Sequence, residues 1–260
     1  MRLIKNGFQS ASFNMALDEA IFRQPSIHPT LRLYRWSRPA FSFGYFQKIS
    51  QIVNVSDCLK NNIDLVRRIT GGGTVVHSWD ITFSLIVPRK RNSLPESISC
   101  DYKTISQCVF HGLSKIGIGV HWPSISIERE KMNICVVNPV RYDMMIDGKK
   151  IMGIAQRRNQ NAILYQSYIA LDSPCESIKL LFSKELNIDT LLASNSTDLN
   201  SHVSPRLTHH QIEQTIISSL KNGVGQDIVP SELSEDEMKL AFQLERKYRS
   251  DQWNFLSQRQ

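Results

Sequence analysis

Apolar and polar residues alternate with a regular period along most of the first third of the chain. Over Met15–Phe22 the apolar residues recur at helical spacing, and a Ser or Asn just before this run can cap a helix. A period of two predicts strands over Thr30–Trp36 and Pro39–Tyr45, which we expect to be neighbours in one sheet. Two further strands are expected over Asp64–Ile69 and Thr74–Val87, separated by a run of glycines.

The rest of the chain mixes both periods. Strands are expected over Ile134–Val137, Tyr142–Ile146, Lys150–Gln156 and Ala162–Leu171. Between two of them, Asp147-Gly148 is a strong signal for a two-residue hairpin turn. Helices are expected over Tyr102–Ile116, Thr208–Lys221 and Ser234–Tyr248, the last opened by acidic capping residues. The order of these elements predicts an α+β fold, in which helices pack on a mostly antiparallel sheet.

Length and composition fit one globular domain. The chain has 260 residues, of which 41% are hydrophobic and 21% charged, close to the averages for such domains. We expect residues 1–195 to form a sheet-and-helix core and residues 205–260 a helical C-terminal segment. No apolar run is long enough to span a membrane, and the first ten residues lack the apolar stretch of a signal peptide. A cytoplasmic protein is therefore expected, with no membrane association.

Charge and cysteine usage narrow the chemistry further. Lys and Arg number 31 and Asp and Glu 24, so the formal charge of +7 favours an acidic partner. The basic residues are not interleaved with aromatic ones as in a nucleic-acid-binding surface, so no nucleic acid is expected. The five cysteines are irregularly spaced and form no C-x-x-C pair, which disfavours a zinc site and a disulfide framework.

A glycine-rich segment, Arg67–His77, is the first candidate for chemistry. It reads Arg-Arg-Ile-Thr-Gly-Gly-Gly-Thr-Val-Val-His, and it matches neither a Walker A loop nor a dinucleotide fingerprint. Backbone N–H groups of three glycines can approach a ligand closely, and two arginines beside them suit a carboxylate, a phosphate or a thioester carbonyl. An ordinary flexible hairpin is the alternative interpretation.

A second candidate lies in the hairpin near the middle of the chain. Lys149 and Lys150 follow the turn on one strand, so their side chains point to opposite faces and one of them can enter a pocket. Cys135 lies thirteen positions before Gly148. Taken alone, Cys135 would be interpreted as a residue of the hydrophobic core.

Four motifs occur in the order typical of one superfamily. They are Asn14–Ala20, Arg67–His77, Gly148–Gln156 and Lys247–Asn254. Together they resemble the lipoate–protein ligase and octanoyltransferase superfamily, whose fold also serves biotin–protein ligases. The resemblance spans nearly the whole chain and is closest to the cysteine-dependent octanoyltransferases, which implies a mixed sheet flanked by helices in the manner of that fold.

The resemblance also implies roles for individual residues. Lys150 is expected to contact the carbonyl of an acyl group, and Cys135 has the spacing of the nucleophilic thiol in the cysteine-dependent members. These two are the expected catalytic residues, and no metal ligand is expected. The residues expected to bind the acyl group or substrate are Arg67, Arg68, Thr70, Gly71, Gly72, Gly73, Val75, His77, Gly153, Ala155 and Gln156.

Three activities are compatible with the resemblance. The first is transfer of an octanoyl or lipoyl group to a lysine of a lipoyl-domain protein through a cysteine acyl-enzyme, with no cofactor. The implied acceptors are dehydrogenase-complex E2 subunits or the glycine cleavage H protein, and an acyl carrier protein is a possible donor. The second is an ATP-dependent lipoate–protein ligase, which needs ATP and Mg²⁺. The third is a non-catalytic relative that binds an acyl group or a lipoyl domain.

Two positions depart from the pattern of the superfamily. Ile154 stands where a Ser is usual, and Gln166 stands where a His is usual. Either change could alter the substrate preference or the activity. Candidates for the lining of an apolar tunnel are Phe41, Phe43, Val75 and Val76, although each of them fits an ordinary core position equally well.

Overall fold

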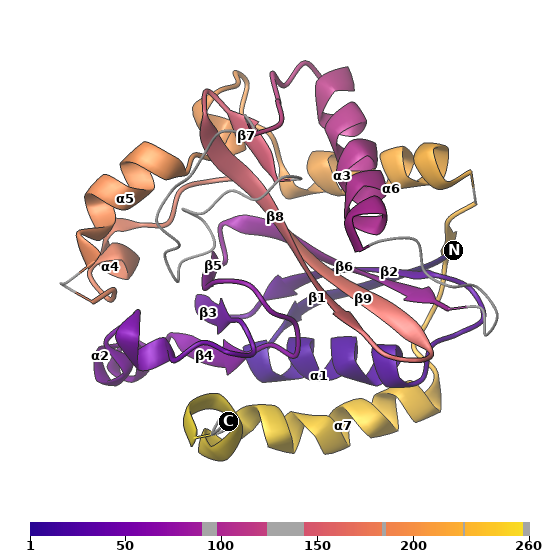
Figure 1. Cartoon of the computed structure of the whole chain (residues 1–260), viewed down its shortest axis with the longest axis horizontal. Coiled ribbons are helices and arrows are strands. Elements are labelled where there is room, and N and C mark those ends of the chain that lie inside the picture. Colours follow the sequence, from indigo (N-terminus) through magenta and orange to yellow (C-terminus); the bar gives the residue numbers. More distant parts are fainter. Residues whose placement is uncertain (90–97, 124–142, 184–185, 226, 257–260) are drawn as a thin grey trace.

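The computed structural model of the chain describes residues 1–89, 98–123, 143–183, 186–225 and 227–256. Figure 1 shows a single broad sheet that crosses the whole molecule, with helices on both of its sides. The expected strand Ile134–Val137 and the expected nucleophile Cys135 lie outside the described residues.

The N-terminal segment begins with a strand that the sequence pattern did not predict. Strand β1 spans Arg2–Gln9 and is followed directly by helix α1, Ala11–Arg23. The helix begins earlier than expected because the Ser10 side chain accepts a hydrogen bond from the backbone N–H of Phe13, as an N-cap does. The expected capping residues before Met15 therefore lie inside the helix.

The main sheet has seven strands in the order β10-β1-β2-β6-β9-β8-β7. Besides β1, these are β2 (Thr30–Trp36), β6 (Asp80–Pro88), β7 (Met144–Ile146), β8 (Lys149–Arg158), β9 (Ala162–Ala170) and β10 (Val229–Pro230). Strand β1 pairs in parallel with both of its neighbours, and the other pairs are antiparallel. The expected α+β fold with a mostly antiparallel sheet is confirmed. Asp147 and Gly148 both have positive φ in the β7–β8 turn, which confirms the hairpin.

A separate sheet of three strands corrects two expectations. Its order is β4-β3-β5, with β3 at Ala40–Phe43, β4 at Asp64–Arg67 and β5 at Val75–His77. Strand β3 was expected beside β2, but it pairs only with β4 and β5 among the described strands. The expected single strand Thr74–Val87 is two strands, because the chain turns at Ser78, with φ of 111°, and passes from the small sheet into the large one.

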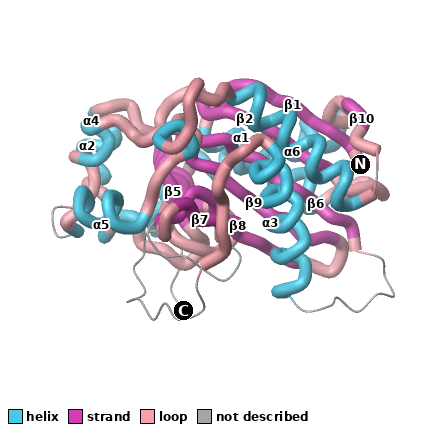
Figure 2. Tube along the Cα trace, turned by 90° about the horizontal axis from the view of Figure 1, so that it is seen from above, coloured by secondary structure: helices cyan, strands magenta, loops and turns pink. Residues whose placement is uncertain are grey.

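Helices cover both faces of the large sheet (Figure 1). Helices α3 (Ile98–Lys115) and α6 (His209–Val224) pack together on one face, and α1 and α7 (Glu235–Arg249) pack together on the other. Three short helices gather beside the small sheet at one end of the molecule (Figure 2): α2 (Val55–Lys60), α4 (Glu176–Lys179) and α5 (Ile188–Asn195). The remaining elements are η1 (Ile49–Gln51), η4 (Leu199–Ser201) and η5 (Gln252–Leu256).

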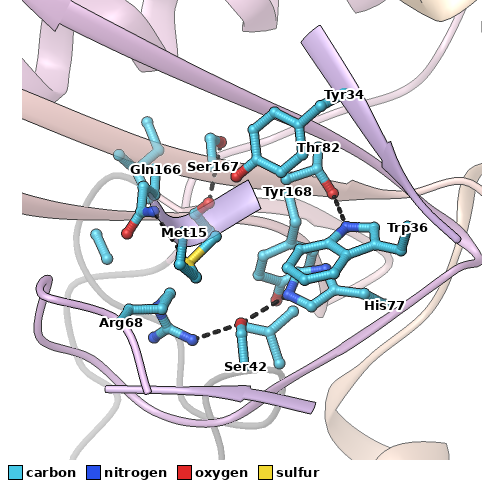
Figure 3. A pocket seen from close by; sticks show the side chains of 14 residues that line it. Met15, Tyr34, Trp36, Ser42, Arg68, His77, Thr82, Gln166, Ser167 and Tyr168 are labelled. Carbon is cyan, nitrogen blue, oxygen red and sulfur yellow. Dashed lines mark hydrogen bonds between the residues drawn. The ribbon is translucent and has the colours of Figure 1, made fainter. Parts of the chain in front are cut away.

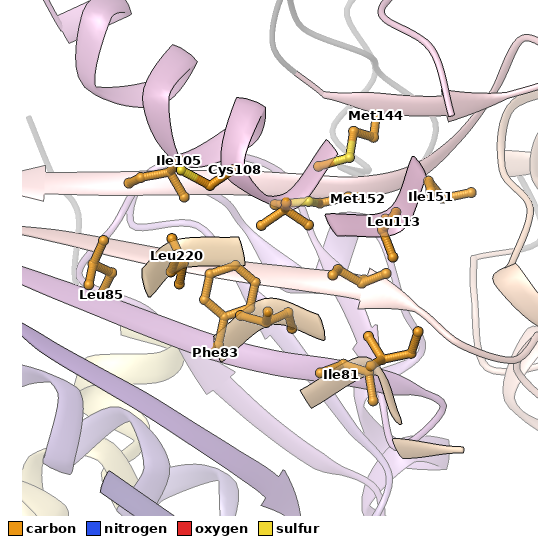
Figure 4. Close-up of a cluster of buried hydrophobic side chains, with 14 of the residues drawn as sticks. Ile81, Phe83, Leu85, Ile105, Cys108, Leu113, Met144, Ile151, Met152 and Leu220 are labelled. Atoms are coloured by element: carbon orange, nitrogen blue, oxygen red, sulfur yellow. The ribbon is translucent and has the colours of Figure 1, made fainter. Parts of the chain in front are cut away.

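Strand alternation divides the apolar residues into separate clusters. On β6, Ile81, Phe83 and Leu85 belong to the cluster beneath α3 and α6, which Figure 4 shows. The intervening residues of the strand face α1 instead, and Thr82 and Ser84 are among them. Burial of each such Leu, Ile or Phe side chain contributes roughly 1.5–3 kcal/mol to folding. The polar face of β6, on the α1 side, is where the site described next is built.

Candidate active site

A pocket opens on the α1 face of the large sheet, where the small sheet meets it (Figure 3). It holds about 360 Å³ of empty space, its open mouth included. Its lining comes from α1, both sheets and the loop after β4, and consists of Met15, Tyr34, Trp36, Ser42, Arg68, Val75, His77, Thr82, Gly153, Ile154, Ala155, Gln166, Ser167 and Tyr168. Segments far apart in the sequence thus converge on one cavity.

The small sheet presents only one of its faces to this pocket. Ser42 and Val75 line the pocket, whereas Phe41 and Phe43 point the other way and pack into the cluster around the short helices. Val76 packs against the same cluster and lines a neighbouring cleft. Of the four expected tunnel residues, Val75 is therefore placed in the pocket. Phe41, Phe43 and Val76 lie outside its lining, because alternation along each strand turns them towards the opposite face of the small sheet.

The two consecutive arginines of the glycine-rich segment have different surroundings. Arg67, expected to bind the acyl group, is fully buried and lies outside the lining of this pocket. Its guanidinium donates four hydrogen bonds of 2.6–2.8 Å, all to backbone carbonyl oxygens, on Tyr45, Gln47, Trp253 and Asn254. Burial lowers the pKa of Arg67. Through these hydrogen bonds, Arg67 links strand β4 of the small sheet to the C-terminal residues Trp253 and Asn254.

Arg68 lies in the wall of the pocket. Its guanidinium donates to Ser42 Oγ at 2.7 Å and to Thr70 Oγ1 at 3.3 Å. It also donates to the carbonyl oxygens of Gly71 and Gly73, at 3.2 and 2.9 Å. Two carbonyl groups of the loop therefore face the Arg68 guanidinium and hold it in place. Thr70 and the three glycines support Arg68 and are not part of the pocket lining.

The glycine run also packs tightly against a second loop. Gly72 has φ of 89°, a conformation that favours glycine. A Cβ atom on Gly44 would lie 1.9 Å from the carbonyl oxygen of Gly72, so only glycine fits at position 44. The close approach of the two loops fixes where Arg68 leaves the backbone.

Gln166 connects the glycine-rich segment to helix α1. Its Oε1 accepts from Thr70 Oγ1, and its Nε2 donates to Asp18 Oδ2, both at 2.7 Å. Asp18 forms an ion pair of 2.7 Å with Arg32, and both side chains are fully buried. The amide that stands where the superfamily usually has an imidazole is thus held at both ends, which fixes its orientation in the pocket.

His77 has a buried hydrogen-bond partner on each ring nitrogen. Its Nε2 lies 2.7 Å from Ser42 Oγ, and its Nδ1 lies 2.7 Å from Asp80 Oδ2. The ring stacks on Trp36, with centroids 3.9 Å apart. Burial alone would raise the pKa of Asp80, but His77 and the hydrogen bonds from Thr82 and the backbone outweigh it, and the pKa of Asp80 is lowered. Asp80 therefore stays ionised behind the imidazole.

Lys150 lies outside the pocket lining, in a cleft that adjoins it. Its side chain is buried and forms an ion pair of 2.6 Å with Asp143. A Cβ atom on Gly153 would lie 3.1 Å from Lys150 Nζ and 3.0 Å from the ring of Tyr168, so the glycine lets both side chains close over it. Gly153 and Tyr168 line the pocket, and Lys150 and Tyr168 line the adjoining cleft. Lys149, by contrast, is partly exposed.

Of the other expected binding residues on strand β8, one lines the pocket and one lies outside its lining. Ala155 lines the pocket beside Gly153, and Ile154 contributes an apolar side chain where the superfamily usually has a hydroxyl. Gln156 is partly buried but outside the lining. Cys135 is outside the residues that the structure describes, so its distance from Lys150 is not defined.

Sequence reasoning missed several residues that shape the pocket. Ser42 is the polar position between Phe41 and Phe43 in an alternating strand, and Asp80 follows His77 by three residues. The sequence shows both residues, but it does not show that they lie together, because that requires knowing that β3, β5 and β6 meet. Asp18 belongs to the first motif of the resemblance, where its charge gave no hint of its partner Arg32.

Neither a metal site nor a membrane-spanning helix is found among the residues that the structure describes. Within the described part of the chain, no group of three or more His, Cys, Asp or Glu side chains could hold a metal ion. Over those same residues, no helix combines the length and the apolar character needed to cross a bilayer.

Comparison with known proteins gives consistent results from sequence and structure. The model of the lipoyl protein ligase A/B catalytic domain matches residues 10–221. The chain is 32% identical to octanoyltransferase LipM of Kyrpidia tusciae, over 98% of both chains, and 30% identical to octanoyltransferase LipM of Bacillus subtilis, over 98% of this chain and 97% of that one.

Solved structures share the fold. The crystal structure of lipoate-protein ligase A bound with ATP superimposes with a TM-score of 0.81 at 24% identity, covering 97% of both chains. A bipartite lipoate protein ligase of Thermoplasma acidophilum, studied with its E2 lipoyl domain, gives 0.83 at 23% identity, covering 100% of this chain and 97% of that one. At these identities the likeness establishes the architecture alone.

Proposed function

Because the chain belongs to the lipoyl protein ligase A/B catalytic domain family, we propose that it is an octanoyltransferase that acts in protein lipoylation. The observation that carries this conclusion is the likeness to octanoyltransferases over almost the entire chain. The pocket supports it, because an apolar cavity walled by Arg68, with the buried ammonium of Lys150 in the adjoining cleft, suits an acyl chain with a reactive carbonyl.

In the first step, the thiolate of Cys135 attacks the carbonyl carbon of an octanoyl thioester, for which an acyl carrier protein is the expected donor. The new carbon–sulfur bond replaces the donor's carbon–sulfur bond, and the donor leaves as a thiol after taking up a proton. The two thioesters are similar in energy, so the step needs neither ATP nor another cofactor. In the second step, a lysine amine of the acceptor attacks the acyl-enzyme, forms an amide and releases the thiolate and a proton.

Lys150 supplies the positive charge for both steps. A buried ammonium requires a counter-ion, and Asp143 provides one at 2.6 Å. Held in this way, the ammonium favours the thiolate form of Cys135 and stabilises the oxyanion that develops on the carbonyl. Lys149 is partly exposed on the other side of the strand and takes no part.

The pocket selects the acyl chain by burying it. Each methylene moved from water into the cavity contributes about 0.8 kcal/mol. Ile154 adds apolar surface where related proteins usually carry a hydroxyl. This favours an unsubstituted octanoyl chain over a lipoyl group, whose ring carries two sulfur atoms.

The acceptor is a lysine on a lipoyl-domain protein. Such domains are commonly acidic, which complements the net charge of +7. A structural neighbour was studied together with its E2 lipoyl domain, which supports an E2 subunit as the kind of partner to test first. The glycine cleavage H protein is the second acceptor to test.

One assay separates this proposal from its alternatives. The full chain is incubated with an apo lipoyl domain and either octanoyl-acyl carrier protein, or free lipoate with ATP and Mg²⁺, and the mass of the acceptor is measured. Octanoylation from the thioester without ATP is expected. Modification only in the presence of ATP would replace the proposal with a ligase, and no modification in either arm would favour a non-catalytic binding protein.

Two pairs of variants test the assigned residues. Cys135→Ser should abolish transfer, whereas Cys175→Ser, at the exposed cysteine that precedes helix α4, should leave it unchanged. Lys150→Ala should lower the rate on the order of 100-fold or more, and Lys149→Ala should not. Full transfer by Cys135→Ser would show that another group is the nucleophile.

A further inference from the structure

A serine, a histidine and an aspartate form an unbroken line of hydrogen bonds in the pocket (Figure 3). The transfer reaction through Cys135 and Lys150 uses none of them. We propose that Ser42, His77 and Asp80 form a second nucleophilic centre, which takes a fatty acyl group from a thioester onto Ser42 Oγ and hydrolyses the resulting ester. The inference rests on the proposed function only in assuming that the pocket admits an acyl thioester.

One tautomer of His77 lets every group in this line donate or accept in turn. The Arg68 guanidinium has only donors, so at 2.7 Å it donates to Ser42 Oγ. With the His77 proton on Nδ1, the Ser42 hydroxyl donates to His77 Nε2, 2.7 Å away. In that tautomer, His77 Nδ1 donates to Asp80 Oδ2. This is the arrangement in which an imidazole serves as the general base for a serine.

The base is held rigidly. The imidazole is clamped between Ser42 and Asp80 and stacked on Trp36, whose indole N–H donates to Thr82 Oγ1 at 2.8 Å. Thr82 Oγ1 in turn donates to Asp80 at 2.7 Å. Each of these side chains is buried, so the imidazole needs no rearrangement before it accepts a proton. Ser42 and His77 both line the pocket, within reach of a bound chain.

The Arg68 guanidinium, beside Ser42, assists the same reaction. Arg68 lies at hydrogen-bond distance from Ser42 Oγ, so it stabilises negative charge that develops there or on an adjacent carbonyl oxygen. It is held by the carbonyl groups of Gly71 and Gly73, which keeps it in place as charge develops.

The reaction balances with water as the only further reactant. His77 Nε2 takes the Ser42 proton while Oγ bonds to the thioester carbonyl carbon. The donor's carbon–sulfur bond breaks, and the leaving sulfur takes that proton from His77. Water then attacks the ester with His77 again accepting a proton, which passes to Ser42 Oγ as the carbon–oxygen bond breaks. Octanoic acid leaves, and the starting state is restored.

The test uses the full chain with Cys135→Ala, incubated with octanoyl-acyl carrier protein in the absence of an acceptor domain. The expected result is one octanoyl group on the peptide that contains Ser42, stable to neutral hydroxylamine as an oxygen ester is, together with slow release of octanoic acid. Adding Ser42→Ala should remove both. Adding Ser42→Cys should move the octanoyl group to a thioester that neutral hydroxylamine cleaves.

Further variants separate chemistry from folding. His77→Gln and Asp80→Asn should each lower the maximal rate of ester formation on the order of 100-fold, while the donor concentration at half-saturation stays near that of the parent. Ser219→Ala is the matched control, because Ser219 is a buried serine that donates only to its own helix, at Ile216 O, far from the pocket. It should form the ester at the parental rate.

The outcomes distinguish this inference from the proposed function. Absence of octanoate on Ser42, with release no faster than in Ser42→Ala, overturns the inference even if the unmodified chain octanoylates a lipoyl domain. An ester on Ser42, found together with no transfer to any lipoyl domain by the unsubstituted chain, supports the inference and overturns the proposed function.

Discussion

Arg67 and Arg68 are consecutive and both buried, yet they belong to two regions of the molecule with different tasks. Arg67 donates only to backbone carbonyl groups, two of them on the C-terminal residues Trp253 and Asn254. Arg68 donates to the hydroxyls of Ser42 and Thr70 as well as to the glycine loop. The first region, the C-terminal anchor, links the C-terminal residues to the small sheet, and the second, the pocket network, forms part of the wall of the pocket.

The difference shows that the partners of a buried charge indicate its role better than its residue type does. Carbonyl groups of the main chain can do little except fix geometry, so a guanidinium saturated by them stabilises a structure. Hydroxyls that also contact an imidazole, as Ser42 contacts His77, can relay protons. We therefore expect substitutions in the anchor to change stability and those in the pocket network to change chemistry.

Arg67→Ala should have the largest effect on stability. It removes four hydrogen bonds to carbonyl groups, one of them buried and three partly buried, and opens a cavity, so the free energy of unfolding should fall by roughly 3–5 kcal/mol. Urea denaturation followed by tryptophan fluorescence measures it. Arg246→Ala, at an exposed site on α7, is the control. A loss below about 1 kcal/mol would contradict the anchor.

Glu19→Gln should have the next largest effect, and one that depends on pH. Burial alone would raise the pKa of Glu19, but Lys247, Tyr248 and Arg23 outweigh it and lower the pKa. A lowered pKa adds stability above the unfolded-state pKa of about 4.3, and this is lost as the pH falls through the folded-state value.

The expected loss on Glu19→Gln is about 2–3 kcal/mol at pH 7, because a buried carboxylate with charged partners is removed. Unfolding free energies measured from pH 7 down to pH 3 should converge for the two proteins at the acid end. A difference that stays constant over this range would show that the charge of Glu19 contributes nothing.

Trp253→Phe should have a smaller effect. The indole N–H donates to the carbonyl oxygen of Arg67 at 3.0 Å, and phenylalanine keeps the ring but loses this bond. A loss of about 1 kcal/mol is expected, visible as a lower urea midpoint with an unchanged slope. A midpoint equal to that of the unsubstituted protein would mean that the bond is replaced by one to water.

Thiol labelling should show no effect at the buried cysteines. Burial raises the pKa of Cys58 to about 12, and burial also raises the pKa of Cys108. Neither should react with iodoacetamide in the native protein at pH 8, whereas exposed Cys175 should react readily. Labelling of Cys58 as fast as Cys175, read by peptide mass spectrometry, would contradict the packing behind the small sheet.

The sequence pattern predicted most elements but not the association between them. Alternation identified the strand at Ala40–Phe43 and its two faces, but not which face would meet the pocket, because that depends on pairing with residues far along the chain. The same limit explains why Arg67 was expected in the pocket: its partners lie 186 and 187 positions away. A strand such as β1, whose parallel partner follows a helix, gives no local hairpin signal.

The measurement that tests this account most directly is the rate of octanoyl transfer per folded molecule, for Arg67→Ala and Arg68→Ala side by side. The folded fraction of each variant is taken from its denaturation curve at the assay temperature. Arg67→Ala should transfer within about threefold of the unsubstituted chain once corrected, and Arg68→Ala should be slower, because it removes part of the wall of the acyl pocket. Equal corrected rates for the two variants would contradict the division between anchor and pocket network.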